Sequence, residues 1–159
     1  MIKANIFREE IIELALKQLG KKYVHGNHGP DTFDCAGFVW YIYNSLYNID
    51  LYECGYGRST TTKILTSKYG IITDNLNKGD ILFFHRQSLK DNMPTENNKY
   101  PGHCGIYLYD NFFVHTTGNN EVMISNFFDI IPNKEKSWND ILVAEKDIIA
   151  DENVLKKRR

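Results

Sequence analysis

The sequence predicts an α+β fold, in which N-terminal helices pack on a central antiparallel sheet. The period of the apolar residues is helical up to about residue 68 and strand-like after it. Helices that precede the strands, rather than alternating with them, are typical of this class. Aromatic residues make up 13% of the chain, which favours a strand-rich core and an aromatic-lined groove.

The composition fits a single globular domain and argues against several other classes of protein. The chain has 159 residues, of which 42% are hydrophobic and 25% charged, so it can bury a core without disulfides. Its 19 basic and 20 acidic residues show no excess of the kind that nucleic-acid binders carry. We predict one domain over residues 1–150, followed at 151–159 by a basic C-terminal tail with a solvated end.

Three helices are expected in the first half of the chain. Asn5 is the predicted N-cap of the first helix, Glu9 and Glu10 suit its positive end, and Gly20 ends it. Its apolar positions are Ile12, Ala15, Leu16 and Leu19. Residues 21–33 contain glycines and a proline and predict a loop. Asp34 then caps a helix over 35–46, and a short helix is expected at 60–68.

The second half of the chain predicts the sheet. A Lys-Gly turn precedes a continuous apolar strand at 81–84, and residues 86–102 are polar and predict a long loop. The further strands are expected at 104–109, 112–116, 121–125 and 141–145.

Cys35 is placed where a helix start would activate its thiol. The chain has three cysteines, and an odd number favours reduced thiols. Unpaired N–H groups in a first helical turn carry partial positive charge, which lowers a thiol pKa, above all beside a histidine. A buried cysteine with a packing role only is the alternative for any one of the three.

Two histidines lie on a predicted hairpin, and its register decides whether they meet. A two-residue turn at 110–111 would place His115 on the opposite face from His103. A three-residue loop at 109–111 places His115 opposite Gly105, diagonal to His103 and on the same face. We predict the odd-length loop or a bulge, because such loops commonly use a residue in the αL conformation and Asn111 tolerates it. If the two rings share a face, His103 could serve a thiol as base and His115 as its orienting partner.

Several motifs, in their order and spacing, resemble the NlpC/p60 family of cell-wall cysteine peptidases. The matching segments are Tyr23 and residues 34–39, 78–84, 102–108 and 113–115. The resemblance covers about residues 6–145. It implies a papain-like fold, a single catalytic domain, and hydrolysis of an amide bond in the peptidoglycan stem peptide.

The resemblance also implies roles for six residues. Cys35 would be the nucleophile, His103 the general base and then the acid, and His115 the group that orients His103. The expected substrate-binding positions are Tyr23, Asp34 and Ala36, and no metal or other cofactor is expected. The typical bond joins γ-D-glutamate to the diamino acid, although some relatives cut the muramoyl–L-alanine amide.

The sequence departs from the family pattern at several positions. Ala36 stands where serine is usual, which removes a polar contact to the substrate. His25 replaces a large aromatic residue, and Cys104 replaces an aliphatic one. Because it follows His103 on a strand, Cys104 should face the opposite way, into the core.

Other classes of function are alternatives to the peptidase. A zinc site could draw on seven side chains, but there is no C-x-x-C pair and His25-x-x-His28 is a weak signal. The candidate ligands are His25, His28, Cys35, Cys54, His103, Cys104 and His115. A non-catalytic wall-binding module and an acyl-transfer enzyme acting on lipid are further alternatives.

The ends of the chain bear on where the protein acts. Residues 1–10 show no apolar signal region, and no apolar run is long enough for a membrane anchor. We therefore expect synthesis in the cytoplasm, with action on the wall as a phage or prophage lysin. A cytosolic enzyme that trims recycled wall peptides is the alternative, and the oligomeric state is left open.

Overall fold

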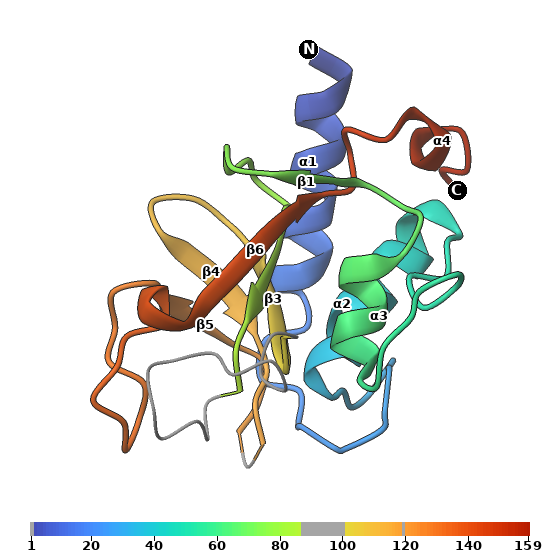
Figure 1. Ribbon diagram of the computed structural model, residues 1–159. Coiled ribbons are helices and arrows are strands. Elements are labelled where there is room, and N and C mark those ends of the chain that lie inside the picture. Colours follow the sequence, from blue (N-terminus) through green and yellow to red (C-terminus); the bar gives the residue numbers. More distant parts are fainter. Residues whose placement is uncertain (1, 87–100, 119) are drawn as a thin grey trace.

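Six antiparallel strands form the central sheet, in the order β1-β6-β2-β3-β4-β5. The computed structural model describes residues 2–86, 101–118 and 120–159. The strands are β1 (Ile71–Thr73), β2 (Ile81–Phe84), β3 (His103–Tyr107), β4 (Phe112–His115), β5 (Met123–Asn126) and β6 (Leu142–Asp147). The helices are α1 (Ile2–Leu16), α2 (Cys35–Tyr47), α3 (Thr60–Thr66) and α4 (Glu152–Leu155). The predicted α+β class, with helices packed on an antiparallel sheet, is confirmed (Figure 1).

The sheet is buried on both faces at its centre, which explains the unbroken apolar run of β2. All four β2 residues are 0% exposed. Ile81 and Phe83 join the main core under the helices. Leu82 and Phe84 join a second cluster on the opposite face, which the segment after β5 covers with Phe127, Ile131 and Trp138. The strand therefore packs against a helical layer on one side and an irregular aromatic layer on the other.

The first helix differs from its predicted bounds. Helix α1 begins at Ile2, so Asn5 lies inside it and is not the N-cap, and Glu9 and Glu10 are beyond the first turn. Ala4 and Phe7 pack against the main core, and this tertiary contact favours an earlier start. At the other end α1 stops at Leu16, tighter turns lead to Gly20 at φ +86°, and Leu19 is 43% exposed rather than in the core.

The second and third helices confirm their predictions within one or two residues. The Asp34 carboxylate accepts a hydrogen bond from the Gly37 N–H at 2.7 Å and caps α2. Ser59 caps α3 in the same way. Strand β1, a 3₁₀ turn at Asn139–Ile141 and helix α4 were not predicted. Of the predicted loop 86–102, residues 87–100 lie outside the described residues.

The C-terminal residues contact the body of the protein, which the sequence did not predict. Val154 of α4 is fully buried, and Asp151 accepts a hydrogen bond from the Gly70 N–H at 2.9 Å. Arg158 pairs with Glu10 of α1, and the Arg159 N–H donates to the Leu46 carbonyl oxygen at the end of α2. The basic end is therefore docked on α1 and α2 instead of free in solvent. The division into 1–150 and 151–159 stays a prediction.

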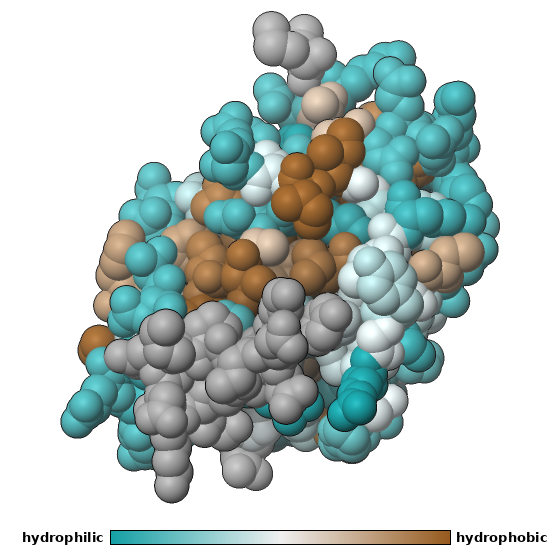
Figure 2. Space-filling model, in the orientation of Figure 1, coloured by the Kyte–Doolittle hydropathy of each residue, from teal (hydrophilic) through white to brown (hydrophobic). Residues whose placement is uncertain are grey.

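The edge strand β1 exposes apolar side chains, with Ile71 at 54% and Ile72 at 55%. Figure 2 shows apolar residues gathered on the face of the molecule that carries β1 and β6.

None of the helices in the described part of the chain is long and apolar enough to cross a membrane.

Candidate active site

Cys35 is the first residue of α2, and the local sequence holds it there. Both oxygens of the Asp34 carboxylate are used, one by the Gly37 N–H and the other by the Gly26 N–H at 3.0 Å. A Cβ at position 37 would lie 2.1 Å from the Asn27 carbonyl oxygen, so a glycine lets the preceding loop pack on the helix start. Asp34 thus acts as a cap that ties the loop to the thiol-bearing turn.

The surroundings of Cys35 lower its pKa well below the usual value of a thiol. The largest cause is a hydrogen bond from the Cys104 thiol, followed by the opposing effect of burial. A hydrogen bond with His103 and the charge of that imidazole also lower the pKa. The Cys35 sulfur lies 4.0 Å from the Gly102 carbonyl oxygen and 3.9 Å from Thr61 Oγ1.

The hairpin has the predicted register. Ile106 pairs with Val114 and Tyr107 with Phe113, and a three-residue loop at 109–111 joins the strands. Asp110 and Asn111 both adopt positive φ, at 51° and 69°. The pairing leaves little room between the strands at Gly105, since a Cβ there would lie 3.0 Å from His115 Cβ. The two histidine rings therefore share one face of the hairpin, as predicted.

A chain of three side chains leads away from the thiol. His103 Nε2 lies 2.8 Å from His115 Nδ1, and His115 Nε2 lies 2.8 Å from Ser125 Oγ on β5. His103 is 4% exposed and His115 is 1% exposed. Burial, followed by the charge of His103, lowers the pKa of His115 well below its usual value, so His115 is neutral at pH 7.

Aromatic rings enclose the histidine pair. The Trp138 ring lies 5.4 Å from the His103 ring and 4.8 Å from the His115 ring, measured between centroids. Phe84 lies against His103 at 5.7 Å, and Phe113 against His115 at 4.5 Å. These contacts exclude water from the bond between the imidazoles, which strengthens it.

A cavity of about 310 Å³ opens onto the Cys35 thiol and the His103 ring. It is also lined by Tyr23, Arg86, Gly102, Thr116, Thr117 and Gly118. Burial raises the pKa of Tyr23, as does the charge of the Cys35 thiolate. A second cavity of about 770 Å³ lies beyond His115 and Ser125 and shares Thr117 and Gly118 with the first.

The structure brings together four of the six predicted site residues and separates the other two from the cavity. Cys35, His103 and Tyr23 line the cavity, and His115 lies behind His103. Asp34 is a helix cap, and Ala36 is 1% exposed in the core. Contact of Asp34 or Ala36 with a substrate stays a prediction.

Three residues of the site were missed by sequence reasoning. The sequence predicts Ser125 on a strand and Thr61 on a short helix, each without a role, and carries no signal for Trp138. For Ser125 a signal existed, because strand pairing of β4 with β5 sets His115 beside the start of β5. Thr61 and Trp138 reach the site from segments far away in sequence, and no local pattern marks them.

The candidate zinc ligands of the alternative interpretation form no metal site in the described part of the chain. Cys104 faces the core and is 0% exposed, as predicted, and the His28 ring packs on Trp40 at 4.6 Å. Within residues 2–86, 101–118 and 120–159, no three His, Cys, Asp or Glu side chains lie close enough to hold a metal ion.

A thiol at a helix start, facing an imidazole on an antiparallel sheet, defines the papain-like class of α+β proteins. The family assignment is narrower than this structural class. The chain belongs to the NlpC/P60 family, whose model matches residues 20–141.

The relatives and solved structures agree with this assignment. The chain is 31% identical over 142 residues to the "Probable endopeptidase YafL" of Escherichia coli K12, covering 87% of this chain and 49% of the relative. It is 27% identical over 154 residues to the "Gamma-DL-glutamyl hydrolase" of Bacillus subtilis, covering 94% of this chain and 32% of the relative. The chain thus spans about half or less of the length of these curated relatives. The solved structure of the NlpC/p60 domain of peptidoglycan hydrolase SagA has the same fold, with a TM-score of 0.57 and 22% identity. The match covers 75% of this chain and 88% of that domain.

Proposed function

We propose that this chain is a cysteine endopeptidase that cleaves an amide bond of the peptidoglycan stem peptide. Cys35 is the nucleophile, His103 the general base and later the acid, and His115 the residue that orients His103. The observation that carries the proposal is the buried 2.8 Å contact between His103 and His115, beside a thiol whose pKa is lowered. Such a set of nucleophile, base and orienting group is the general requirement for covalent hydrolysis.

The first half of the reaction forms an acyl-enzyme. The thiolate of Cys35, which lines the cavity, attacks the amide carbon, and the negative charge moves to the carbonyl oxygen. Among the described residues, the Cys35 N–H has no protein acceptor, and it lies at the positive end of α2. It can therefore donate to the oxyanion, a contact of a kind that contributes about 3–4 kcal/mol.

The protonation of His103 and the neutral state of His115 together fix the tautomer of His115. When His103 holds the thiol proton, both of its nitrogens are donors, so His115 Nδ1 must accept from His103 Nε2. A neutral His115 then carries its proton on Nε2 and donates it to Ser125 Oγ. His103 next gives a proton to the leaving amine, and water hydrolyses the acyl-enzyme.

The bond between γ-D-glutamate and the diamino acid is the substrate we propose. A relative named as a gamma-DL-glutamyl hydrolase, aligned over 94% of this chain, supports γ-glutamyl specificity. Cleavage of the muramoyl–L-alanine amide is the alternative. For delivery, we propose action on the intact wall as a phage or prophage lysin, with trimming of recycled wall peptides as the alternative.

Digestion of purified sacculi by the purified chain tests this proposal. We expect new diamino-acid amine ends and γ-glutamyl carboxyl ends in the released fragments, identified by mass spectrometry. New L-alanine amine ends would instead assign the amidase reaction, and cleavage of free muropeptides alone would assign recycling.

The matched control is Cys35→Ala, which removes one sulfur atom and leaves the cap and the histidines in place. We expect it to abolish hydrolysis while far-UV circular dichroism and thermal unfolding stay close to those of the parent protein. Undiminished hydrolysis by a well-folded Cys35→Ala protein would exclude the mechanism.

A further inference from the structure

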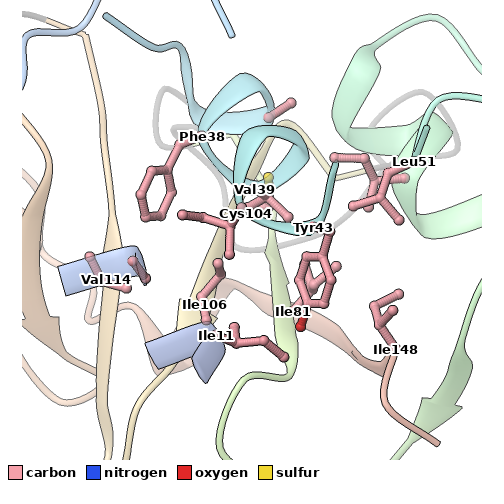
Figure 3. Close-up of a cluster of buried hydrophobic side chains, with 14 of the residues drawn as sticks. Ile11, Phe38, Val39, Tyr43, Leu51, Ile81, Cys104, Ile106, Val114 and Ile148 are labelled. Atoms are coloured by element: carbon pink, nitrogen blue, oxygen red, sulfur yellow. The ribbon is translucent and has the colours of Figure 1, made fainter. Parts of the chain in front are cut away.

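A second thiol, on the core side of the catalytic face, lies directly beside the proposed nucleophile. Cys104 Sγ lies 3.5 Å from the carbonyl oxygen of Cys35. Thr61 Oγ1 lies near both sulfur atoms, 3.9 Å from that of Cys35 and 4.0 Å from that of Cys104. Figure 3 shows the Cys104 side chain against α2, next to Val39. The proposed peptidase chemistry uses the first of these thiols and has no step for the second.

The two thiols differ in their access to solvent. Cys35 lines the open cavity of about 310 Å³. Cys104 is 0% exposed and belongs to the main hydrophobic core. A reagent that enters the cavity therefore meets Cys35 first, and Cys104 can react with what forms on Cys35 but not directly with the reagent.

We propose that Cys104 captures an oxidised Cys35 as an intramolecular disulfide, which protects the nucleophile from irreversible oxidation. In the first step the Cys35 thiolate takes one oxygen from a hydroperoxide, which leaves hydroxide from hydrogen peroxide and a sulfenic acid on Cys35. In the second step the Cys104 sulfur bonds to the Cys35 sulfur. The S–O bond breaks, and the hydroxyl group leaves with the Cys104 proton as water.

The protonation state of each thiol suits its part in these two reaction steps. A lowered pKa keeps Cys35 ionised, and the thiolate is the form that attacks the oxygen of a hydroperoxide. Burial raises the pKa of Cys104, so it stays protonated and unreactive until an electrophilic sulfur lies next to it. The Thr61 hydroxyl contacts both sulfurs, so the two thiols share one neighbour.

Alternatives for Cys104 make different predictions. If it is a small core residue and nothing more, valine would replace it without any effect on the fate of oxidised Cys35. In that case peroxide would carry Cys35 to the sulfinic and sulfonic acids, which thiol reductants do not reverse.

The test uses the full chain carrying Cys54→Ser, because Cys54 is exposed and could form disulfides between molecules. The protein is treated with hydrogen peroxide, denatured, alkylated with iodoacetamide and analysed by mass spectrometry. We expect a loss of about 2 Da, no alkylation at positions 35 and 104, and a peptide pair joined through them. Dithiothreitol should return both thiols to the alkylatable form.

The matched variant adds Cys104→Val to the same background. Here we expect a gain of about 32 Da or more at Cys35 that dithiothreitol does not remove. The same gain in the protein that retains Cys104, with Cys104 still open to alkylation, would overturn the proposal. If the valine variant does not fold, the peptide map of the Cys54→Ser protein decides the question by itself.

These readouts are masses, so they do not depend on the proposed peptidase activity. A chain that forms the disulfide and hydrolyses no wall peptide would keep this inference and lose the proposed function. A chain that hydrolyses wall peptides and forms no disulfide would do the opposite.

Discussion

Replacement of Ser125 by alanine tests whether His115, which we propose orients His103, is itself held in one tautomer. Ser125 Oγ lies 2.8 Å from His115 Nε2, and both residues are buried. With the hydroxyl removed, His115 loses the acceptor that keeps its proton on Nε2. The alternative tautomer would place a proton on Nδ1, opposite the Nε2 donor of a protonated His103, where the two hydrogens repel.

The expected loss of transition-state stabilisation follows from the hydrogen bond that Ser125 makes to His115 and from the His115 donor that its removal leaves unpaired. A hydrogen bond between uncharged groups contributes about 0.5–1.5 kcal/mol, and a buried donor left unpaired costs about 1–3 kcal/mol. Ser125 also lines the cavity of about 770 Å³, from which a water molecule can partly replace the hydroxyl. A net loss of about 1–2 kcal/mol corresponds to about a 5- to 30-fold fall in kcat/KM.

The assay measures kcat/KM of Ser125→Ala for a γ-glutamyl muropeptide across pH, together with the ¹⁵N chemical shifts of His115. We expect the fall in kcat/KM to appear mainly in kcat, with the Nε2-protonated signal of His115 reduced. Ser125→Thr keeps the hydroxyl and should recover most of the activity. An unchanged kcat/KM and unchanged ¹⁵N shifts in Ser125→Ala would refute the reasoning.

Three further predictions concern the site and its support. His103→Ala should lower kcat by about 10²–10⁴-fold and His115→Ala by less, because a general base is harder to replace than the group that orients it; equal losses in steady-state assays would argue against these roles. Because the pKa of Cys35 is lowered well below its usual value, its alkylation by iodoacetamide should stay fast below pH 7, where the denatured chain reacts slowly. A steep loss of rate in the folded chain between pH 9 and 7 would contradict the assigned ionisation. Lys146 is 2% exposed, and its three N–H groups are shared among three carbonyl oxygens and one hydroxyl at the end of α3. Lys146→Met should lower the free energy of unfolding by about 2–4 kcal/mol in urea titrations, since it leaves these acceptors unpaired. Lys17→Met, on an exposed part of the chain, should change it little.

The sequence predicted the elements whose signals are local. Asp34 caps α2 through its own turn, and the apolar run of β2 identifies a buried strand whatever lies on either face. The loop at 109–111 set the hairpin register, so the shared face of His103 and His115 could be worked out from turn geometry.

Elements that depend on distant contacts escaped prediction. The start of α1 is set by packing of Ala4 and Phe7 on the core, which overrides the capping tendency of Asn5. Strand β1 is three residues long and exists because β6 pairs with it. The C-terminal residues dock because Val154 is buried in the core and Arg158 forms an ion pair with Glu10.

By itself the sequence determined the class of fold, the helix start at Cys35 and the shared face of the two histidines, because turns, caps and period-2 strands act over a few residues. The pairing of Cys35 with His103 was implied by the resemblance to the NlpC/p60 family. Tertiary structure alone decided what surrounds them. Ser125, Trp138 and Thr61 reach the histidines and the thiol from separate segments. It also decided that Cys104 lies beside Cys35, since the packing of β3 under the start of α2 joins residues 69 positions apart.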